Sequence, residues 1–259
     1  MNLGFFGFGN LARALDGGMI KGGKIAPESI WVCDMSEAAQ SEAVSRGHNI
    51  AADVTELFAN CDIIAMTIKP KIFRALADEL RALDSSNKLI FSPMAAVSIA
   101  ELKAVFSCPV MRIMPTIAST DCRDIIGYTT DREGDFAPIL ELLNSLGEIM
   151  ELDEDSLGRL TVTASCGLGF AAHIMETYRI RCIEQGFSDE EAAKITAAMF
   201  SYAAEFGTKE GGFAGLESRV ATKGGVTEAG NLAMNDELYS AVGKAFSAAC
   251  SIMGMTEKK

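Results

Sequence analysis

Residues 7–12 read Gly7-Phe8-Gly9-Asn10-Leu11-Ala12, directly after the apolar run Leu-Gly-Phe-Phe at residues 3–6. An apolar run that leads into a Gly-x-Gly-x-x-Ala pattern and then into helical sequence is typical of a nucleotide-binding βα unit. The first glycine allows the tight turn, the second lets the main chain approach a pyrophosphate, and the N–H groups that open the helix attract negative charge. We therefore expect a dinucleotide to contact Gly7, Phe8, Gly9, Asn10 and Leu11. A glycine-rich turn without a ligand is the alternative.

The alternation of strand and helix patterns continues outward to about residue 152. Apolar runs suited to strands lie at residues 29–33, 62–68, 88–92, 109–114, 124–130 and 148–152. Helical patterns separate them, at residues 11–20, 36–46, 71–80, near 99–105 and at 136–146. Such alternation is the signature of βαβ units. It predicts an α/β, Rossmann-like, doubly wound sheet for residues 1–155.

The rest of the chain, residues 156–259, has a different pattern. Strand signals stop after the acidic stretch at 151–155, and the sequence up to Met255 is nearly all helix-compatible. Ser188 and Glu191 form a capping box that opens one helix, which we expect to end at Gly207 in a left-handed cap. The many alanines of these helices bury little area, so we expect this all-α domain to need a partner subunit for dimerisation.

Asp34 is placed to select the form of the cofactor. It follows the second predicted strand, about 20 residues after the glycine turn, where an acidic side chain accepts hydrogen bonds from both hydroxyls of the adenosine ribose. Asp34 would repel a 2′-phosphate, and no Lys or Arg lies between Trp31 and Gln40 to bind one. The pattern favours NAD over NADP. The alternative is that Asp34 only caps the helix that follows Ser36.

The composition argues against several other classes of protein. With 35 acidic and 23 basic residues the formal net charge is −12, which opposes binding to nucleic acid or to a membrane surface. No stretch reaches the roughly 18 apolar residues of a membrane span, and no basic segment of a secretory signal precedes the first apolar run. Seven scattered cysteines and only two histidines, His48 and His173, argue against disulfides and a metal site and favour the cytoplasm.

Four segments, in order, resemble the pyrroline-5-carboxylate reductase family, and the match covers essentially the whole chain. GFFGFGNLARAL (residues 4–15) is similar to the family's GFIGxGNMxxA, and IIAMTIKP (63–70) to its IIxAVKP. VMRIMPT (110–116) is similar to xxRxMPN, and TKGGVTEAG (222–230) to an SPGGTTxxG-like loop. The resemblance implies an NAD(P)H-dependent oxidoreductase that reduces the C=N bond of pyrroline-5-carboxylate to give proline. It also implies a homodimer or a higher assembly of dimers.

The resemblance assigns further residues to the cofactor. Lys69 and Pro70 border the nicotinamide ribose, at the end of a strand where an α/β sheet opens its ligand crevice. Met114 and Pro115 form the floor near the nicotinamide ring. From the residues alone, Lys69 on a solvated loop and a plain turn at residues 114–116 remain equally open.

The resemblance places the substrate at the C-terminal half, at a dimer interface. Thr227 is the catalytic residue, whose hydroxyl orients the imine nitrogen. Substrate contacts are assigned to Thr222, Gly224, Gly225, Cys166 and Gly167, and the two loop glycines offer N–H groups to the substrate carboxylate. Two plainer roles stay open: Thr227 as a helix cap, and Cys166 as a packing residue rather than a reactive thiol at a helix start.

The sequence departs from the family pattern where the substrate should lie. ASCGLGF at 164–170 replaces an sGSGPAY-like segment, MPTIAS at 114–119 replaces MPNTPA, and SPMAA at 92–96 replaces SIAAG. Two other segments keep the family pattern. They are the glycine turn at residues 7–9, called the phosphate turn below, and the loop of Gly224 and Gly225, called the Gly-Gly loop. Two alternatives to proline synthesis therefore stay open: a related imine reductase with a different substrate, and a dinucleotide-binding paralogue without turnover.

Overall fold

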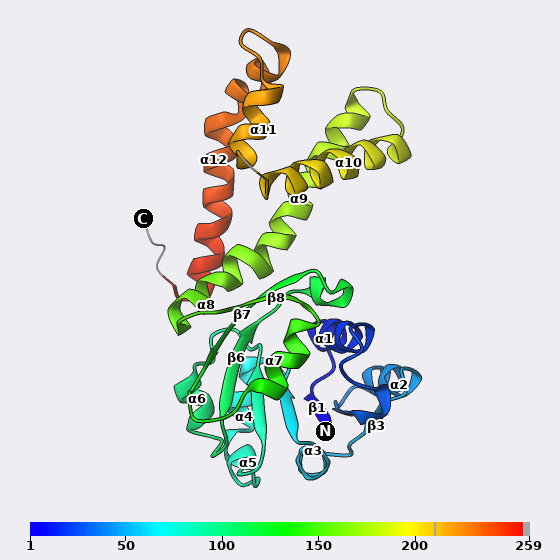
Figure 1. Cartoon of the computed structure of the whole chain (residues 1–259), viewed down its shortest axis with the longest axis vertical. Helices are drawn as coiled ribbons and strands as arrows, with labels where there is room; N and C mark the ends of the chain where they lie inside the picture. Colours follow the sequence, from blue (N-terminus) through cyan, green and yellow to red (C-terminus); the bar gives the residue numbers. More distant parts are fainter. Residues whose placement is uncertain (210, 256–259) are drawn as a thin grey trace. The chain divides into compact units, whose positions relative to one another are not determined.

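The computed structural model describes residues 1–209 and 211–255, which divide into two compact units between Ser165 and Cys166. The first unit (Figure 1) contains one sheet. It has eight strands in the order β3-β2-β1-β4-β5-β6-β7-β8. The strands are β1 (Leu3–Phe6), β2 (Ile30–Cys33), β3 (Asn49–Ile50), β4 (Ile63–Met66), β5 (Leu89–Ser92), β6 (Val110–Met114), β7 (Asp124–Thr130) and β8 (Gly147–Glu151). Only the β6–β7 pair is antiparallel, so β7 and β8 run against the other strands. The predicted Rossmann-like sheet is confirmed.

Helices cover both faces of this sheet. They are α1 (Asn10–Lys21), α2 (Glu37–Ser45), α3 (Val54–Asn60), α4 (Pro70–Ala75), α5 (Ala77–Arg81), α6 (Ile99–Lys103), α7 (Ala137–Asn144) and α8 (Glu154–Leu160), with 3-10 turns η1 (Pro27–Ser29) and η2 (Ile117–Asp121). Helices α1, α2 and α7 share one apolar core with Phe5, and α3 to α6 share another with Phe6. Successive side chains of a strand point to opposite faces, so these two neighbours belong to different cores.

The sequence patterns miss some short elements. They do not predict β3, which has two residues, or α3 and η2. The predicted helix at 71–80 is two helices, α4 and α5, that meet at Leu76. Gly4 accounts for the place of α3, because a Cβ there would lie 2.9 Å from the sulfur of Cys61 and 3.0 Å from Leu57. The glycine therefore lets α3 lie directly against β1.

The described residues of the second unit form helices and connecting loops, without strands. Its helices are α9 (Gly167–Glu184), α10 (Asp189–Gly207), α11 (Gly212–Val220) and α12 (Val226–Ile252). The expected boundary at residue 155 lies inside α8, and a π-helical turn, η3 (Thr161–Cys166), continues α8 into α9. The strand signals that stop near residue 152 mark the end of the sheet, whereas the first compact unit extends to Ser165.

Helix α10 begins as predicted and ends differently. The Ser188 hydroxyl accepts the Glu191 N–H, and the Glu191 carboxylate accepts the Ser188 N–H, which completes the capping box. The expected left-handed cap at Gly207 is wrong, because Gly207 is the last helical residue and Thr208, the cap, is right-handed. A Cβ at Gly207 would lie 2.1 Å from the ring of Phe213. The glycine makes room for this ring from α11.

The helical unit exposes many large apolar side chains. Tyr202, Leu232 and Tyr239 are 54%, 73% and 84% exposed. A helical domain that functions alone buries most such groups, and larger apolar patches mark interaction surfaces. The exposure agrees with the expectation that these helices need a partner subunit. None of the described helices combines the length and apolar character needed to cross a membrane.

Candidate dinucleotide site and substrate loop

Gly7 makes the tight turn after β1. Its φ is 94°, in the left-handed region that favours glycine, and its N–H donates to the Cys33 carbonyl at 2.8 Å. A Cβ at Gly7 would lie 3.0 Å from both Ile68 Cγ2 and the Thr67 carbonyl oxygen. The turn therefore lies close against the end of β4, at the point where the strand order reverses and open α/β sheets bind their ligands.

Gly9 leaves the start of α1 open. It is the N-cap residue, no side chain caps it, and both Gly9 and Asn10 are exposed. The first helical hydrogen bond runs from the Arg13 N–H to the Gly9 carbonyl, so the N–H groups of residues 10–12 have no partner within the helix. A Cβ at Gly9 would meet nothing within 4 Å. These free N–H groups and the positive end of the helix form a suitable place for a pyrophosphate.

The buried side chain of Phe8 anchors the turn in the core. Its ring is fully buried and packs edge-on against Phe5 and His48, with ring centroids 6.0 and 5.9 Å apart. The guanidinium groups of Arg13 and Arg46 lie 5.9 and 5.7 Å from the centre of the same ring. The Phe8 N–H donates to Asp34, so it is already used within the protein.

Asp34 joins the phosphate turn to the end of β2. One carboxylate oxygen accepts the Phe8 N–H at 2.6 Å and the other accepts the Ser36 N–H at 2.8 Å. The cap of α2 is Ser36, whose hydroxyl accepts the Ala39 N–H. The suggestion that Asp34 is itself that cap is therefore wrong. Each carboxylate oxygen can accept a second hydrogen bond, and Asp34 is half-buried, so a ribose hydroxyl can still reach it.

Two neighbours of this turn have no role in the sequence prediction. The Thr67 hydroxyl donates to the carbonyl of Gly7 at 2.7 Å and reaches that of Phe6 at 3.1 Å. It lies within the IIAMTIKP segment, yet nothing in its spacing indicates this contact. Cys33 is buried beside Asp34, and burial first, then the charge of Asp53 and of Asp34, raises the pKa of its thiol to about 11. Cys33 is thus a neutral packing residue.

Lys69 and Pro70 lie at the carboxyl end of β4, as expected for residues near the ligand crevice. Lys69 is the exposed cap of α4 and Pro70 is its first residue. Met114 and Pro115 lie at the end of β6 and are both buried. Strands β1, β4 and β6 are parallel members of one sheet, so these residues share the edge that carries the Gly7 turn.

Thr116 has a structural partner. Its N–H and hydroxyl donate to the two carboxylate oxygens of Asp124 at 2.7 and 2.9 Å, and Asp124 is 3% exposed. The Ser119 hydroxyl donates to the same carboxylate at 2.5 Å. This cluster fixes η2, which packs so closely on α1 that a Cβ at Gly18 would lie 2.1 Å from the Ser119 carbonyl. The altered MPTIAS segment is therefore a rigid part of the first unit.

Cys166 does not lie at the start of a helix. It ends the π-helical turn, and α9 continues from Gly167 without a break, so Cys166 has right-handed helical angles and both residues are half-buried. A thiol within a continuous helix does not face free N–H groups, and the proposed reactive position is wrong. The preceding Ser165 hydroxyl donates to the Pro115 carbonyl at 3.0 Å. This bond brings two of the altered segments together.

The Gly-Gly loop precedes α12 in the second unit. Gly224 has φ of 74°, and its N–H donates to Glu228 Oε2 at 2.7 Å. The Gly225 N–H donates to the Thr222 carbonyl at 2.8 Å. Both N–H groups that the sequence suggests for a substrate carboxylate are thus occupied within the protein. A polar hollow of about 310 Å³ adjoins the loop, and Glu217, Glu228 and Asn231 line it.

Thr227 is the second residue of α12 and is exposed. The cap of this helix is Gly225, and no side chain serves as cap. The alternative explanation of Thr227 as a helix cap is therefore wrong. Its place in the first turn of α12 puts the residue at the helix end whose dipole attracts anions.

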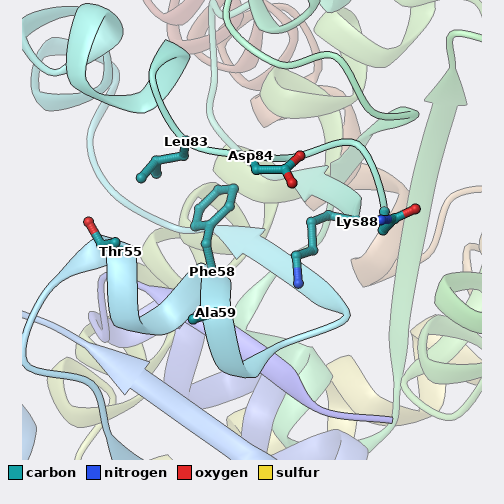
Figure 2. Close-up of a pocket in the computed structure, with 7 residues that line it drawn as sticks. Thr55, Phe58, Ala59, Leu83, Asp84 and Lys88 are labelled. Carbon is teal, nitrogen blue, oxygen red and sulfur yellow. The ribbon is translucent and has the colours of Figure 1, made fainter.

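A further hollow lies near the amino ends of β4 and β5, and Figure 2 shows residues that line it. It has a volume of about 290 Å³, between the end of α3 and the loop before β5. Phe58, Asp84 and Lys88 are among its walls, and Lys88 Nζ donates to the Cys61 carbonyl at 2.8 Å. The phosphate turn lies at the carboxyl ends of the strands, so this hollow is no part of the dinucleotide site.

Comparison with known proteins covers both units. The protein-family model "NADP oxidoreductase coenzyme F420-dependent" matches residues 2–96. A second family model, "Pyrroline-5-carboxylate reductase dimerisation", matches residues 154–254. Curated pyrroline-5-carboxylate reductases of Staphylococcus aureus (strain COL) and Staphylococcus haemolyticus are each 26% identical, over 89% of this chain and 88% of theirs.

Solved structures share the fold. Pyrroline carboxylate reductase of Plasmodium falciparum, solved with NADP bound, has a TM-score of 0.87 at 21% identity and covers 98% of this chain and 97% of its own. The Coxiella burnetii pyrroline-5-carboxylate reductase has a TM-score of 0.83 at 22% identity, with 99% of each chain covered. A reductive aminase of Aspergillus terreus has a TM-score of 0.60 at 20% identity, over 98% of this chain and 88% of its own. With a glycine turn in the first unit and a match to the dimerisation model in the second, the chain is similar to pyrroline-5-carboxylate reductases along both units.

Proposed function

We propose that this protein is an NAD(P)H-dependent oxidoreductase acting on a C=N bond, and that it reduces pyrroline-5-carboxylate to proline. The open start of α1 after the left-handed Gly7 carries the proposal, because it offers a fitting place for a pyrophosphate. The two curated relatives described above have a similar length and are named pyrroline-5-carboxylate reductase, which supports pyrroline-5-carboxylate as the substrate.

The chain's residues would divide the work between cofactor and substrate. The N–H groups of Asn10 and Leu11 would bind the pyrophosphate, Asp34 the adenosine ribose, and Lys69 to Pro70 with Met114 to Pro115 would border the nicotinamide end. When bound, the nicotinamide supplies the hydride. Thr227 would hold the protonated imine nitrogen by its hydroxyl, so that the hydride adds to carbon and the proton stays on nitrogen as the amine.

We propose that NADH is preferred to NADPH. Asp34 follows β2 and Glu37 is the first residue of α2, so two carboxylates lie close together in the sequence here. Met35, between them, is uncharged and fully exposed. A 2′-phosphate carries negative charge and needs a cation or N–H groups, and the two acidic groups would oppose it. The Plasmodium falciparum relative was solved with NADP bound, and Kd values of this chain for NADH and NADPH test the proposed preference.

The second unit is the proposed dimerisation and substrate domain. Its matched family region and its exposed apolar helices support a homodimer, and a higher assembly of dimers is the further proposal. The substrate carboxylate would bind at the loop of Thr222, Gly224 and Gly225, with Cys166 and Gly167 as neighbours. Binding there requires the Glu228 carboxylate to leave the Gly224 N–H.

Glu228 also favours a second candidate, a related imine reductase whose substrate has no carboxylate. A carboxylate already bonded to the loop competes with an acid substrate and does not compete with a neutral or cationic imine. The test is oxidation of NADH and NADPH by the purified protein with pyrroline-5-carboxylate and with 1-pyrroline, which lacks the carboxylate. We expect turnover of pyrroline-5-carboxylate with the higher kcat/KM. Saturable NADH binding without turnover of either imine would overturn both candidates in favour of a non-catalytic paralogue.

A further inference from the structure

The loop between β5 and α6 holds an alanine in a conformation that favours glycine. Ala96 has φ of 55°, in the left-handed region, and it is exposed at the turn of residues 95–96. A Cβ makes this region unfavourable, and such residues persist only where the surroundings hold them. Met94 and Val97, on either side of the turn, are buried. They anchor the ends of the loop and leave the exposed turn to be held by other contacts.

Arg74 supplies that contact. Its Nη2 donates to the Ala96 carbonyl at 2.7 Å, and its Nε donates to Glu101 Oε1 at 2.7 Å. Nη2 also reaches Glu101 Oε2 at 3.3 Å, so the guanidinium holds both carboxylate oxygens. Glu101 is fixed in turn, because its N–H donates to Ser98, the cap of α6. One side chain of α4 thus ties the strained turn to the helix that follows it.

The turn of residues 95–96 lies where the contact with Arg74 can affect the proposed dinucleotide site. Arg74 lies on α4, the helix that Lys69 caps, and the turn follows β5, the strand between β4 and β6 in the sheet. The phosphate turn and Asp34 follow β1 and β2, so an extended dinucleotide that starts there continues across β4, β5 and β6. The loop of residues 93–98 therefore belongs to the nicotinamide end of the proposed site.

We propose that Arg74 is a positioning residue, which holds the Ala95–Ala96 turn in its left-handed form so that this loop shapes the nicotinamide end of the dinucleotide site. The inference rests on the dinucleotide binding of the proposed function and adds a residue to it. Exposed ion pairs by themselves contribute little to stability, so the contact with the Ala96 carbonyl is the part with a consequence for the ligand.

The chain provides a matched control. Arg81 lies on the next helix, α5, and is 51% exposed against 50% for Arg74. It also combines a carboxylate, Asp78, with a main-chain carbonyl, that of Ala104 at 3.1 Å. Its carbonyl partner lies at the end of α6, away from the loop. Arg81→Met therefore removes the same kind of contact without affecting the turn.

The test compares NADH with ADP-ribose, which lacks the nicotinamide, by calorimetric titration of the full chain. For Arg74→Met we expect the Kd for NADH to rise about tenfold, the size of effect that one strained residue represents, with the Kd for ADP-ribose within about twofold. Arg81→Met should leave both unchanged. Ala96→Gly relieves the strain, so the double variant Arg74→Met with Ala96→Gly should recover most of the NADH affinity. Arg74→Lys, which cannot hold both partners with a planar fork, should recover less.

The outcomes separate this inference from the proposed function. Equal effects of Arg74→Met and Arg81→Met, or an equal loss for NADH and ADP-ribose, would overturn the positioning role alone. A double variant as weak as Arg74→Met would overturn it as well, because glycine would then have no strain to relieve. If the unaltered protein binds neither NADH nor ADP-ribose, the proposed dinucleotide site fails, and the positioning role fails with it.

Discussion

The carboxylate of Asp34 accepts the N–H of Phe8 at 2.6 Å, so the residue proposed to bind the adenosine ribose also holds the phosphate turn. The two roles are joined in one side chain, because its other oxygen is fixed by the Ser36 N–H. We therefore expect a change at Asp34 to alter the shape of the turn as well as the charge at the proposed ribose position. A substitution that changes the cofactor preference should then also affect binding of the pyrophosphate.

Asp34→Ala should weaken the binding of both cofactors, and that of NADH more strongly than that of NADPH. The loss of two hydrogen bonds to a carboxylate, each worth about 1.5–3 kcal/mol, disturbs the turn, while loss of the negative charge helps NADPH alone. We expect the Kd for NADH to rise at least about tenfold and that for NADPH to change less. Asp34→Asn, which keeps one acceptor for the Phe8 N–H, is the control and should lose less NADH affinity. Unchanged NADH binding in Asp34→Ala would contradict the role in the turn.

Gly7 and Gly9 should respond differently to the same substitution. Gly7→Ala forces a Cβ into the left-handed region and against Thr67 and Ile68, which should reduce the free energy of unfolding by about 1–2 kcal/mol or more. Gly9→Ala meets nothing in the protein, so its stability should stay within about 0.5 kcal/mol, while its Cβ intrudes on the pyrophosphate. Urea unfolding and NADH titration measure the two effects. If the Gly9→Ala protein binds NADH as tightly as the unaltered protein, the proposal that the pyrophosphate binds at this turn is wrong.

The sequence predicts the first unit well because its signals are local. A buried strand, a glycine turn and a helix follow one another between Leu3 and Lys21, and the structure has each of them. Asp34 is found by its spacing from the turn. Its bond to the Phe8 N–H depends on how two loops meet, and no local pattern encodes that.

The second unit shows where local signals mislead. The sequence predicts that Gly207 ends its helix in a left-handed cap. In the structure Gly207 is still helical, and the absence of a side chain makes room for the ring of Phe213 from α11. The sequence predicts a helix start near Cys166, because the family segment compared with residues 164–170 begins a helix. In the structure Cys166 ends a π-helical turn that continues into α9. The Gly-Gly loop reads as two free N–H groups, but Thr222 and Glu228 fold back onto them. At Gly207 the deciding contact is tertiary, and in the Gly-Gly loop it comes from residues on either side of the turn.

Thr227→Ala should lower kcat much more than it affects cofactor binding. The residue is exposed and does not cap α12, so its removal should leave the helix intact, while the proposed hydrogen bond to the imine nitrogen would be lost. We expect kcat with pyrroline-5-carboxylate to fall by roughly 10²-fold with the Kd for NADH unchanged. Thr227→Ser keeps the hydroxyl and should retain most of the activity. Steady-state rates together with NADH titration test this, and parallel losses in kcat and NADH affinity would argue against the assigned role.

Glu228→Ala should improve the use of an acid substrate. Its carboxylate bonds to the Gly224 N–H, the group proposed for the substrate carboxylate, so each binding event must displace it and overcome like-charge repulsion. We expect the KM for pyrroline-5-carboxylate to fall about three- to tenfold, as for removal of roughly 1 kcal/mol of competition, and the KM for 1-pyrroline to stay within about twofold. Glu217→Ala is the matched control, because Glu217 lines the same hollow and bonds to Asn231 instead of the loop. A KM that rises for pyrroline-5-carboxylate would show that Glu228 supports the loop in its binding shape and does not compete with the substrate.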